Sequence, residues 1–223
     1  MRLLTIFAHP IRTSYPGRVM EAFHEPFESD GHMIDVLDLH AEGFDPRFTG
    51  ADHAHFWGGE IPAGIAEAHR RVEAADRLAF VFPVYWWSMP AVMKGWIDRV
   101  FTGGWAYQYG AGVEDRGTQP LNGLLPRVPT SLIGVGGSSQ RTYDRYRYIE
   151  AMRTQIDVGV FAYCGIKDVE SHFIFDIEAP GNTDARQVGL ERARTIGQEF
   201  MSPHRRVRDA KNEHFEVRLD RAR

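Results

Sequence analysis

Residues 78–109 read LAFVFPVYWWSMPAVMKGWIDRVFTGGWAYQY, and this stretch indicates how the chain folds. Its first five residues, Leu78 to Phe82, are apolar and rich in β-forming types, which is typical of a short strand buried on both faces. Pro83 ends the strand, three aromatic residues follow at positions 85–87, and apolar residues then recur at helical spacing. The stretch therefore predicts a strand, an aromatic turn and a helix.

The aromatic turn predicts a ligand site. In open α/β sheets, ligands bind outside the carboxyl ends of the strands, which is where this turn falls. Tyr85, Trp86 and Trp87 would give a flat wall beside backbone N–H groups, with Ser88 as helix cap and Pro90 in the first helical turn. Such a wall suits a planar, hydrogen-bonding ligand such as an isoalloxazine ring. The alternative is that the two tryptophans pack under a neighbouring loop.

A second loop of this kind follows the first predicted strand, Arg2 to Ala8. His9 and Pro10 close the strand, and hydroxyl groups at Thr13 and Ser14 precede a helix that starts at about Pro16. Hydroxyls, free N–H groups and a helix dipole together form an anion site. Plain helix capping is the alternative.

A third loop follows the strand predicted for residues 130–135. It begins with Gly136 and Gly137, and paired glycines at a strand end let backbone N–H groups approach a ligand closely. Taken alone, a Gly-Gly-Ser-Ser sequence is usually only a loop. It becomes informative because, like the other two loops, it follows the carboxyl end of a predicted strand.

The rest of the chain alternates between strand and helix patterns. Strands are expected at 33–37 and 166–175, helices at 19–27, 61–75, 149–164 and 184–201, and an irregular segment at 38–59. Connected βα units of this kind predict an α/β fold, a doubly wound five-stranded parallel sheet with helices on both faces. Residues 1–201 form the predicted domain, and residues 202–223 a charged C-terminal tail.

Composition excludes several classes of protein. With 223 residues, 43% hydrophobic and 25% charged, the chain has the composition of one globular, cytoplasmic domain. The net charge of −4 offers no attraction to nucleic acid, and no apolar run is long enough for stable membrane insertion. Cys164 is predicted to be a buried structural thiol. His40, His53 and His55 match no tetrahedral spacing, so no metal is expected.

The three loops also resemble one family. The segments FPVYWWSMPAVMKGWIDRVFTGGWAY and HPIRTSY are similar to those of the flavodoxin-like NAD(P)H:quinone oxidoreductases, the DT-diaphorase group and its bacterial relatives. This resemblance implies a flavoprotein with FAD, or FMN as the other candidate, that takes hydride from NAD(P)H and delivers it to a quinone or similar acceptor in a ping-pong reaction. It also implies a homodimer with shared active sites.

The resemblance further implies a set of site residues. Phosphate groups of the flavin would be held by His9, Thr13, Ser14 and Tyr15. The ring would be lined by Pro83, Val84, Tyr85, Trp86, Trp87, Gly134, Val135, Gly136, Gly137 and Tyr143. The N–H groups of Gly136 and Gly137 would donate to the pyrimidine edge, and Tyr143 and Gly137 would be the catalytic residues. A loop carrying Trp105, Tyr107 and Tyr109 would face substrate in the partner subunit.

The sequence departs from the family in two places. Pro16 stands where relatives carry Asn, and it removes an amide side chain and a backbone donor, which bears on FAD against FMN. The family's active-site histidine is missing, and Tyr146 and Tyr148 occupy its neighbourhood. One alternative function is a redox-regulatory subunit of a potassium-efflux transporter. A phosphoacceptor receiver domain is excluded because His9 and Pro10 replace its acidic cluster.

Overall fold

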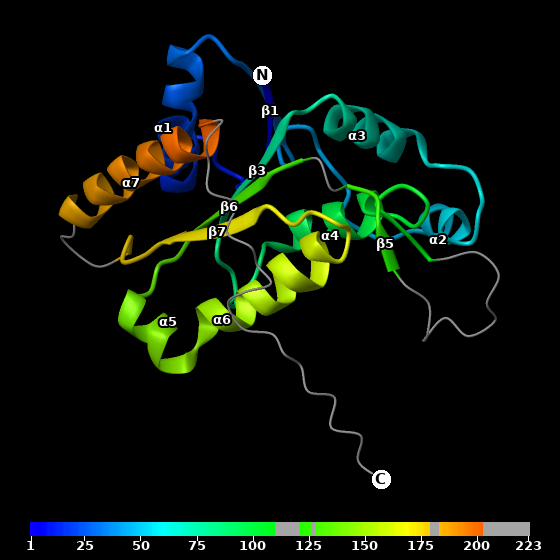
Figure 1. Ribbon diagram of the computed structural model, residues 1–223. Coiled ribbons are helices and arrows are strands. Elements are labelled where there is room, and N and C mark those ends of the chain that lie inside the picture. Colours follow the sequence, from blue (N-terminus) through cyan, green and yellow to red (C-terminus); the bar gives the residue numbers. More distant parts are fainter. Residues whose placement is uncertain (110–120, 126–127, 179–182, 203–223) are drawn as a thin grey trace.

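The computed structural model describes residues 1–109, 121–125, 128–178 and 183–202, and a parallel sheet forms its centre (Figure 1). The five strands are β1 (Arg2–Phe7), β2 (Met33–Asp38), β3 (Arg77–Pro83), β6 (Thr130–Val135) and β7 (Val169–Ile174). They lie side by side in the order β2-β1-β3-β6-β7, and every pairing is parallel. The predicted doubly wound, five-stranded parallel sheet is confirmed.

The central strands are buried because helices cover both of their faces. Along β1, Leu3 and Phe7 belong to the core on one face, while Leu4 and Ile6 belong to the core on the other. Strands β3 and β6 are buried almost throughout in the same way. This explains why both strands read as continuous apolar runs rather than as alternating patterns.

Helices α1 (Tyr15–Ser29) and α7 (Thr183–Met201) lie side by side on one face of the sheet (Figure 1). Phe23 and Phe27 of α1 contact Phe200 of α7, with ring centroids 6.1 and 6.5 Å apart. Gly197 makes this close approach possible, because a side chain there would collide with the carbonyl oxygen of Phe23. The last helix of the described residues is thus fixed against the first.

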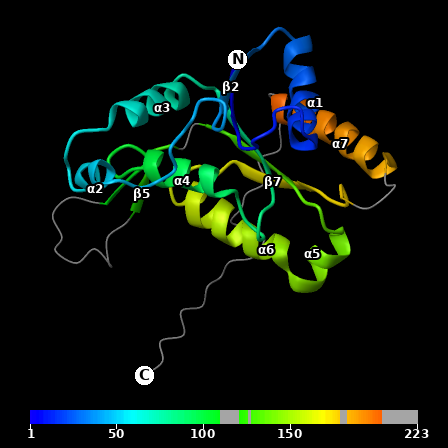
Figure 2. The same cartoon turned by 180° about the vertical axis from the view of Figure 1, so that it is seen from behind.

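The opposite face carries α3 (Ala63–Glu73), α4 (Ala91–Val100), α5 (Gln140–Tyr146), α6 (Tyr148–Arg153) and the π-helix η1 (Thr154–Ala162) (Figure 2). Phe80 of β3 contacts Trp96 of α4 and Phe161 of η1, with ring centroids 5.9 and 5.1 Å away. The single regular helix predicted for residues 149–164 is wrong in its type. It is a short α-helix that continues into a π-helix.

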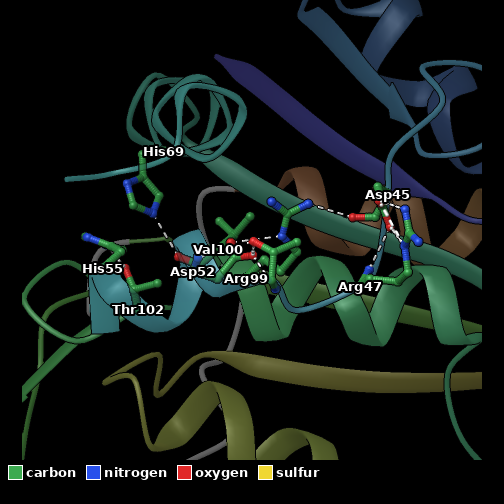
Figure 3. A network of polar contacts seen from close by, with 9 residues as sticks. Asp45, Arg47, Asp52, His55, His69, Arg99, Val100 and Thr102 are labelled. Atoms are coloured by element: carbon green, nitrogen blue, oxygen red, sulfur yellow. Dashed lines mark hydrogen bonds and ion pairs between the residues drawn. The ribbon is translucent and has the colours of Figure 1, made fainter. Parts of the chain in front are cut away.

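The segment predicted to be irregular at residues 38–59 contains a short helix, α2 (Gly50–Phe56). Thr49 and Asp52 form a capping box at its start. The carboxylate of Asp52 also accepts a hydrogen bond from Arg99 Nε of α4 at 3.0 Å, and Arg99 donates to the carbonyl oxygen of Asp45 at 2.7 Å (Figure 3). This buried ion pair holds the α2 segment against α4.

A small antiparallel hairpin of β4 (Tyr107–Tyr109) and β5 (Leu121–Gly123) interrupts the connection between α4 and β6. The sequence did not predict these strands. Gly123 packs so closely on Gly165 that a side chain would have no room there. None of the described helices combines the length and the apolar composition that a membrane span requires. Of the predicted charged tail, residues 203–223 lie outside the described residues.

Candidate functional site

The sheet order brings the ends of β1, β3 and β6 together. Strand β3 pairs with β1 on one side and with β6 on the other. Beyond the paired residues, the N–H of Ala8 donates to the carbonyl oxygen of Val81 at 3.2 Å, and the N–H of Val84 donates to that of Val135 at 2.8 Å. The three loops that follow these strands therefore lie on one edge of the sheet, as predicted.

The aromatic turn after β3 has an unusual backbone. Tyr85 and Ser88 exchange two backbone hydrogen bonds, of 3.1 and 3.0 Å, around Trp86 and Trp87. Both tryptophans have left-handed backbones, with φ values of 47° and 58°. Two-residue turns of this type normally use Asn and Gly, because a side chain here costs about 1–2 kcal/mol per residue. Such strain is typical of functional sites.

The two tryptophans have different surroundings. Trp86 is 93% exposed, whereas Trp87 is half-buried and lies flat on the ring of Tyr148, with centroids 3.7 Å apart. The Oγ of Ser88 donates to Oε1 of Gln155 in η1 at 3.0 Å. Ser88 therefore closes the turn and is not the predicted helix cap, since α4 begins after Pro90. The packing alternative is wrong for Trp86, and Trp87 packs on the first residue of α6 rather than under a loop.

In the glycine loop after β6, one of the two predicted hydrogen-bond donors to a ligand is wrong. The N–H of Gly136 donates to the carbonyl oxygen of Ile174 at 2.8 Å, so it extends the β6–β7 ladder and is not available to a ligand. A side chain at Gly136 would collide with the hydroxyl of Tyr143. Gly137, half-buried, is the next position along the loop, and of the two predicted donors it alone can serve a ligand.

Tyr143 is buried beside these glycines. The centroid of its ring lies 5.2 Å from that of Trp87, with 81° between the planes, and 4.6 Å from that of Phe175. Burial, and then the charge of Glu178, raises the pKa of Tyr143 to about 12. The phenol therefore keeps its proton at neutral pH and can donate a hydrogen bond.

A cavity lies between the aromatic turn after β3 and the glycine loop after β6. Its lining residues are Val84, Trp86, Trp87, Gly137, Ser138, Tyr143 and Glu178. Five of these were predicted from the sequence as ring-lining residues. Ser138 and Glu178 were missed, although Ser138 directly follows the predicted glycines. Glu178 lies just beyond the carboxyl end of β7, a strand end that the sequence argument did not use.

The loop after β1 forms the start of α1. Ser14 is the N-cap residue, yet its side chain makes no capping hydrogen bond, and its buried Oγ has no partner among the described residues. An unpaired hydroxyl at a helix N-terminus fits an anionic group such as a phosphate. His9 bonds the backbone of Ile11 through Nδ1, and the Tyr15 hydroxyl donates to the carbonyl oxygen of Arg186 at 2.7 Å. These two side chains hold the loop.

Comparisons with known proteins place the chain in a family. Residues 1–196 match the Flavodoxin_2 family model, described as a flavodoxin-like fold. NAD(P)H dehydrogenase [quinone] 1 from Cavia porcellus is 32% identical over 199 residues, which cover 79% of this chain and 69% of that protein. The chain belongs to the flavodoxin-like NAD(P)H:quinone oxidoreductase family. It is therefore an oxidoreductase.

Further similar proteins support this family assignment of the oxidoreductase. NAD(P)H dehydrogenase [quinone] 1 from Rattus norvegicus is 29% identical over 209 residues, covering 85% of this chain and 74% of that protein. Among solved structures, the NAD(P)H:quinone oxidoreductase from Methanothermobacter marburgensis has 29% identity and a TM-score of 0.79. That match covers 89% of this chain and 98% of the other.

Of the three aromatic residues predicted to face substrate, Trp105 and Tyr107 are not among the described residues that line the cavity of this oxidoreductase. Trp105 stacks on His69 of α3 at 3.9 Å, and its indole N–H donates to Oε1 of Glu73 at 2.7 Å. The ring of Tyr107 lies 5.1 Å from that of Tyr163. The side chain of Tyr109 lies outside the described part of the chain. Trp105 thus anchors the loop that carries the two tyrosines.

Proposed function

We propose that this protein is a flavin-dependent oxidoreductase that passes hydride from NAD(P)H to a quinone or similar acceptor in a ping-pong, two-electron reaction. One observation carries the proposal. A cavity walled by Trp86, Trp87 and Tyr143 opens at the carboxyl edge of the sheet, where α1 begins at Ser14, whose hydroxyl has no partner in the described part of the chain. A planar ring and a phosphate handle suit these two features together.

The residues that line the cavity would then have different roles. The bound flavin would supply the redox chemistry by accepting two electrons and a proton and passing them on. Trp87, backed by Tyr148, would form one wall of the slot, and the exposed Trp86 also lines it. Gly137 presents backbone to the ring without a side chain. Tyr143, protonated at neutral pH, would donate a hydrogen bond where charge develops.

The flavin's phosphate groups would bind at the start of α1. Ser14 supplies the unpaired hydroxyl and the helix N-terminus supplies the dipole, with Thr13 exposed on the same loop. We propose FAD on the family resemblance, with FMN as the other candidate because Pro16 removes a backbone donor that a diphosphate would use.

A homodimer with shared active sites completes the proposal, and we place it in the cytoplasm. Tyr107 and Tyr109 would then face the substrate slot of the partner subunit. Phe56 and Trp57, half or more exposed on and beside α2, support an interface with a second copy. The mass of the protein in solution tests this: a monomer at micromolar concentration would contradict it.

The function itself is tested by the colour and turnover of the purified protein. We expect flavin absorption bands, a released cofactor identified by its mass, and quinone-dependent oxidation of NADH or NADPH. In stopped-flow traces, Tyr143→Phe should slow reduction of the flavin by NAD(P)H. A protein that binds neither flavin would contradict the proposal. Negligible oxidation, with co-purification of a potassium-efflux transporter, would favour the regulatory alternative.

A further inference from the structure

Glu178 lies in the wall of the cavity, on the turn that follows β7. Its carboxyl group rests against Gly137: a side-chain carbon added to that glycine would lie 2.5 Å from Oε2 and 2.9 Å from Oε1. The same cavity is walled by Trp87 and Tyr143. The carboxylate is therefore next to the glycine whose N–H is the predicted donor to a ligand.

The turn that carries Glu178 is held in place. Arg186 of α7 donates from Nε to the carbonyl oxygen of Ile177 at 2.9 Å, so the residue before Glu178 is tied to a helix of the core. The N–H of Asp176 also donates to the carbonyl oxygen of Ser138 at 3.2 Å, which joins this turn to the glycine loop. The position of Glu178 beside Gly137 follows from these two bonds.

The charge of Glu178 acts on groups in the cavity. After burial, it is the second cause that raises the pKa of Tyr143, because a nearby negative charge opposes formation of a phenolate. The same argument applies to any ligand group that becomes more negative in this cavity. Solvent at the exposed carboxylate moderates the effect without removing it.

We propose that Glu178 lowers the reduction potential of a flavin bound in this cavity, by placing a negative charge beside Gly137. The inference rests on the proposed function. Reduction by NAD(P)H transfers two electrons and one proton to the ring, so the ring gains one negative charge. A fixed carboxylate disfavours that gain, and the reduced ring becomes a stronger donor to the acceptor.

The test compares midpoint potentials of flavin-loaded proteins, measured by equilibration with reference dyes. Glu178→Gln keeps the size of the side chain and removes its charge. We expect binding of reduced relative to oxidised flavin to increase about tenfold, which equals a potential about 30 mV more positive for a two-electron couple. Glu178→Asp retains the charge and should stay close to the wild type.

A second variant separates local charge from net charge. Glu199→Gln removes one exposed carboxylate from α7, outside the cavity lining, and should leave the potential unchanged. An unshifted or more negative potential in Glu178→Gln would overturn the inference, as would an equal positive shift in Glu199→Gln.

The proposed function is tested separately, with the wild-type protein alone. If the wild type binds no flavin, that function falls and the role of Glu178 falls with it. If the wild type binds flavin and reacts with NAD(P)H, while Glu178→Gln has the wild-type potential, the function stands and only the role of Glu178 is lost.

Discussion

The indole of Trp87 lies on the phenol ring of Tyr148, with 3.7 Å between the centroids and 13° between the planes. Tyr148 is the first residue of α6, and Gln155, about two helical turns further on in η1, accepts the hydrogen bond from Ser88. One helical segment thus holds the strained turn at two points. The π-helical geometry of η1 is itself common at functional sites.

Tyr148→Ala should weaken flavin binding about tenfold. An aromatic pair contributes roughly 0.5–1.5 kcal/mol beyond the area that it buries, and its loss would free Trp87 to leave its position in the cavity wall. Fluorescence titration of the flavin-free protein measures the dissociation constant. Tyr148→Phe keeps the stack and should bind as the wild type does; equal affinities for all three proteins would show that the stack has no role in binding.

Trp86→Gly should stabilise the fold while it impairs turnover. Glycine adopts the left-handed backbone at φ 47° without the cost of a side chain, so this variant should be about 1 kcal/mol more stable to urea than Trp86→Ala. Both variants lose the exposed indole and should have a higher KM for the quinone. If Ala and Gly gave equal stabilities, the turn would hold no strain at this position.

Most of the fold could be predicted from the sequence because buried parallel strands are short apolar runs. The strand expected at residues 130–135 is β6 itself, and the others differ from prediction by three residues or fewer at either end. The helix α2 was missed, although the pattern of its capping box, Thr49 and Asp52, can be recognised in the sequence. The π-helix could not be predicted, since its composition is that of any buried helix.

The site was less predictable, because the parts that the sequence analysis missed depend on contacts between residues far apart in the sequence. The aromatic turn and the glycines were found from local patterns. The stack of Tyr148 on Trp87 requires α6 to pack beneath the turn, and the position of Glu178 requires β7 to pair with β6. The bond that occupies the Gly136 N–H also comes from that pairing, so no local pattern could reveal it.

Asp52→Asn should destabilise the protein by about 3 kcal/mol at pH 7, because it leaves Arg99 without its buried partner. Burial alone would raise the pKa of Asp52, but hydrogen bonds from Thr49 and Arg99 hold it below its usual value. The pair therefore stabilises the fold above pH 4, and this contribution is lost as the pH falls through the lowered pKa. Urea unfolding at pH 3 and pH 7 should show a smaller difference between variant and wild type at pH 3.

Asp157 of η1 has the opposite behaviour with pH. Burial raises the pKa of its carboxyl to about 6, although a hydrogen bond of 2.5 Å from Ser171 and the charge of Arg153 oppose the shift, and Glu170 adds to it. A carboxyl whose pKa is raised on folding stabilises the native state fully below its unfolded pKa of about 4. That contribution is lost as the pH rises through about 6.

Asp157→Asn should therefore have little effect on stability at pH 4 and stabilise the protein by about 3 kcal/mol at pH 8. The amide oxygen can still accept the hydrogen bond from Ser171, while the cost of burying a charge disappears. Chemical unfolding at half-unit steps between pH 4 and pH 8 measures the difference. Asp144→Asn, which removes an exposed carboxylate from α5, is the matched control and should give a flat difference. A flat difference for Asp157→Asn as well would mean that this carboxyl titrates at its ordinary pKa in the folded protein.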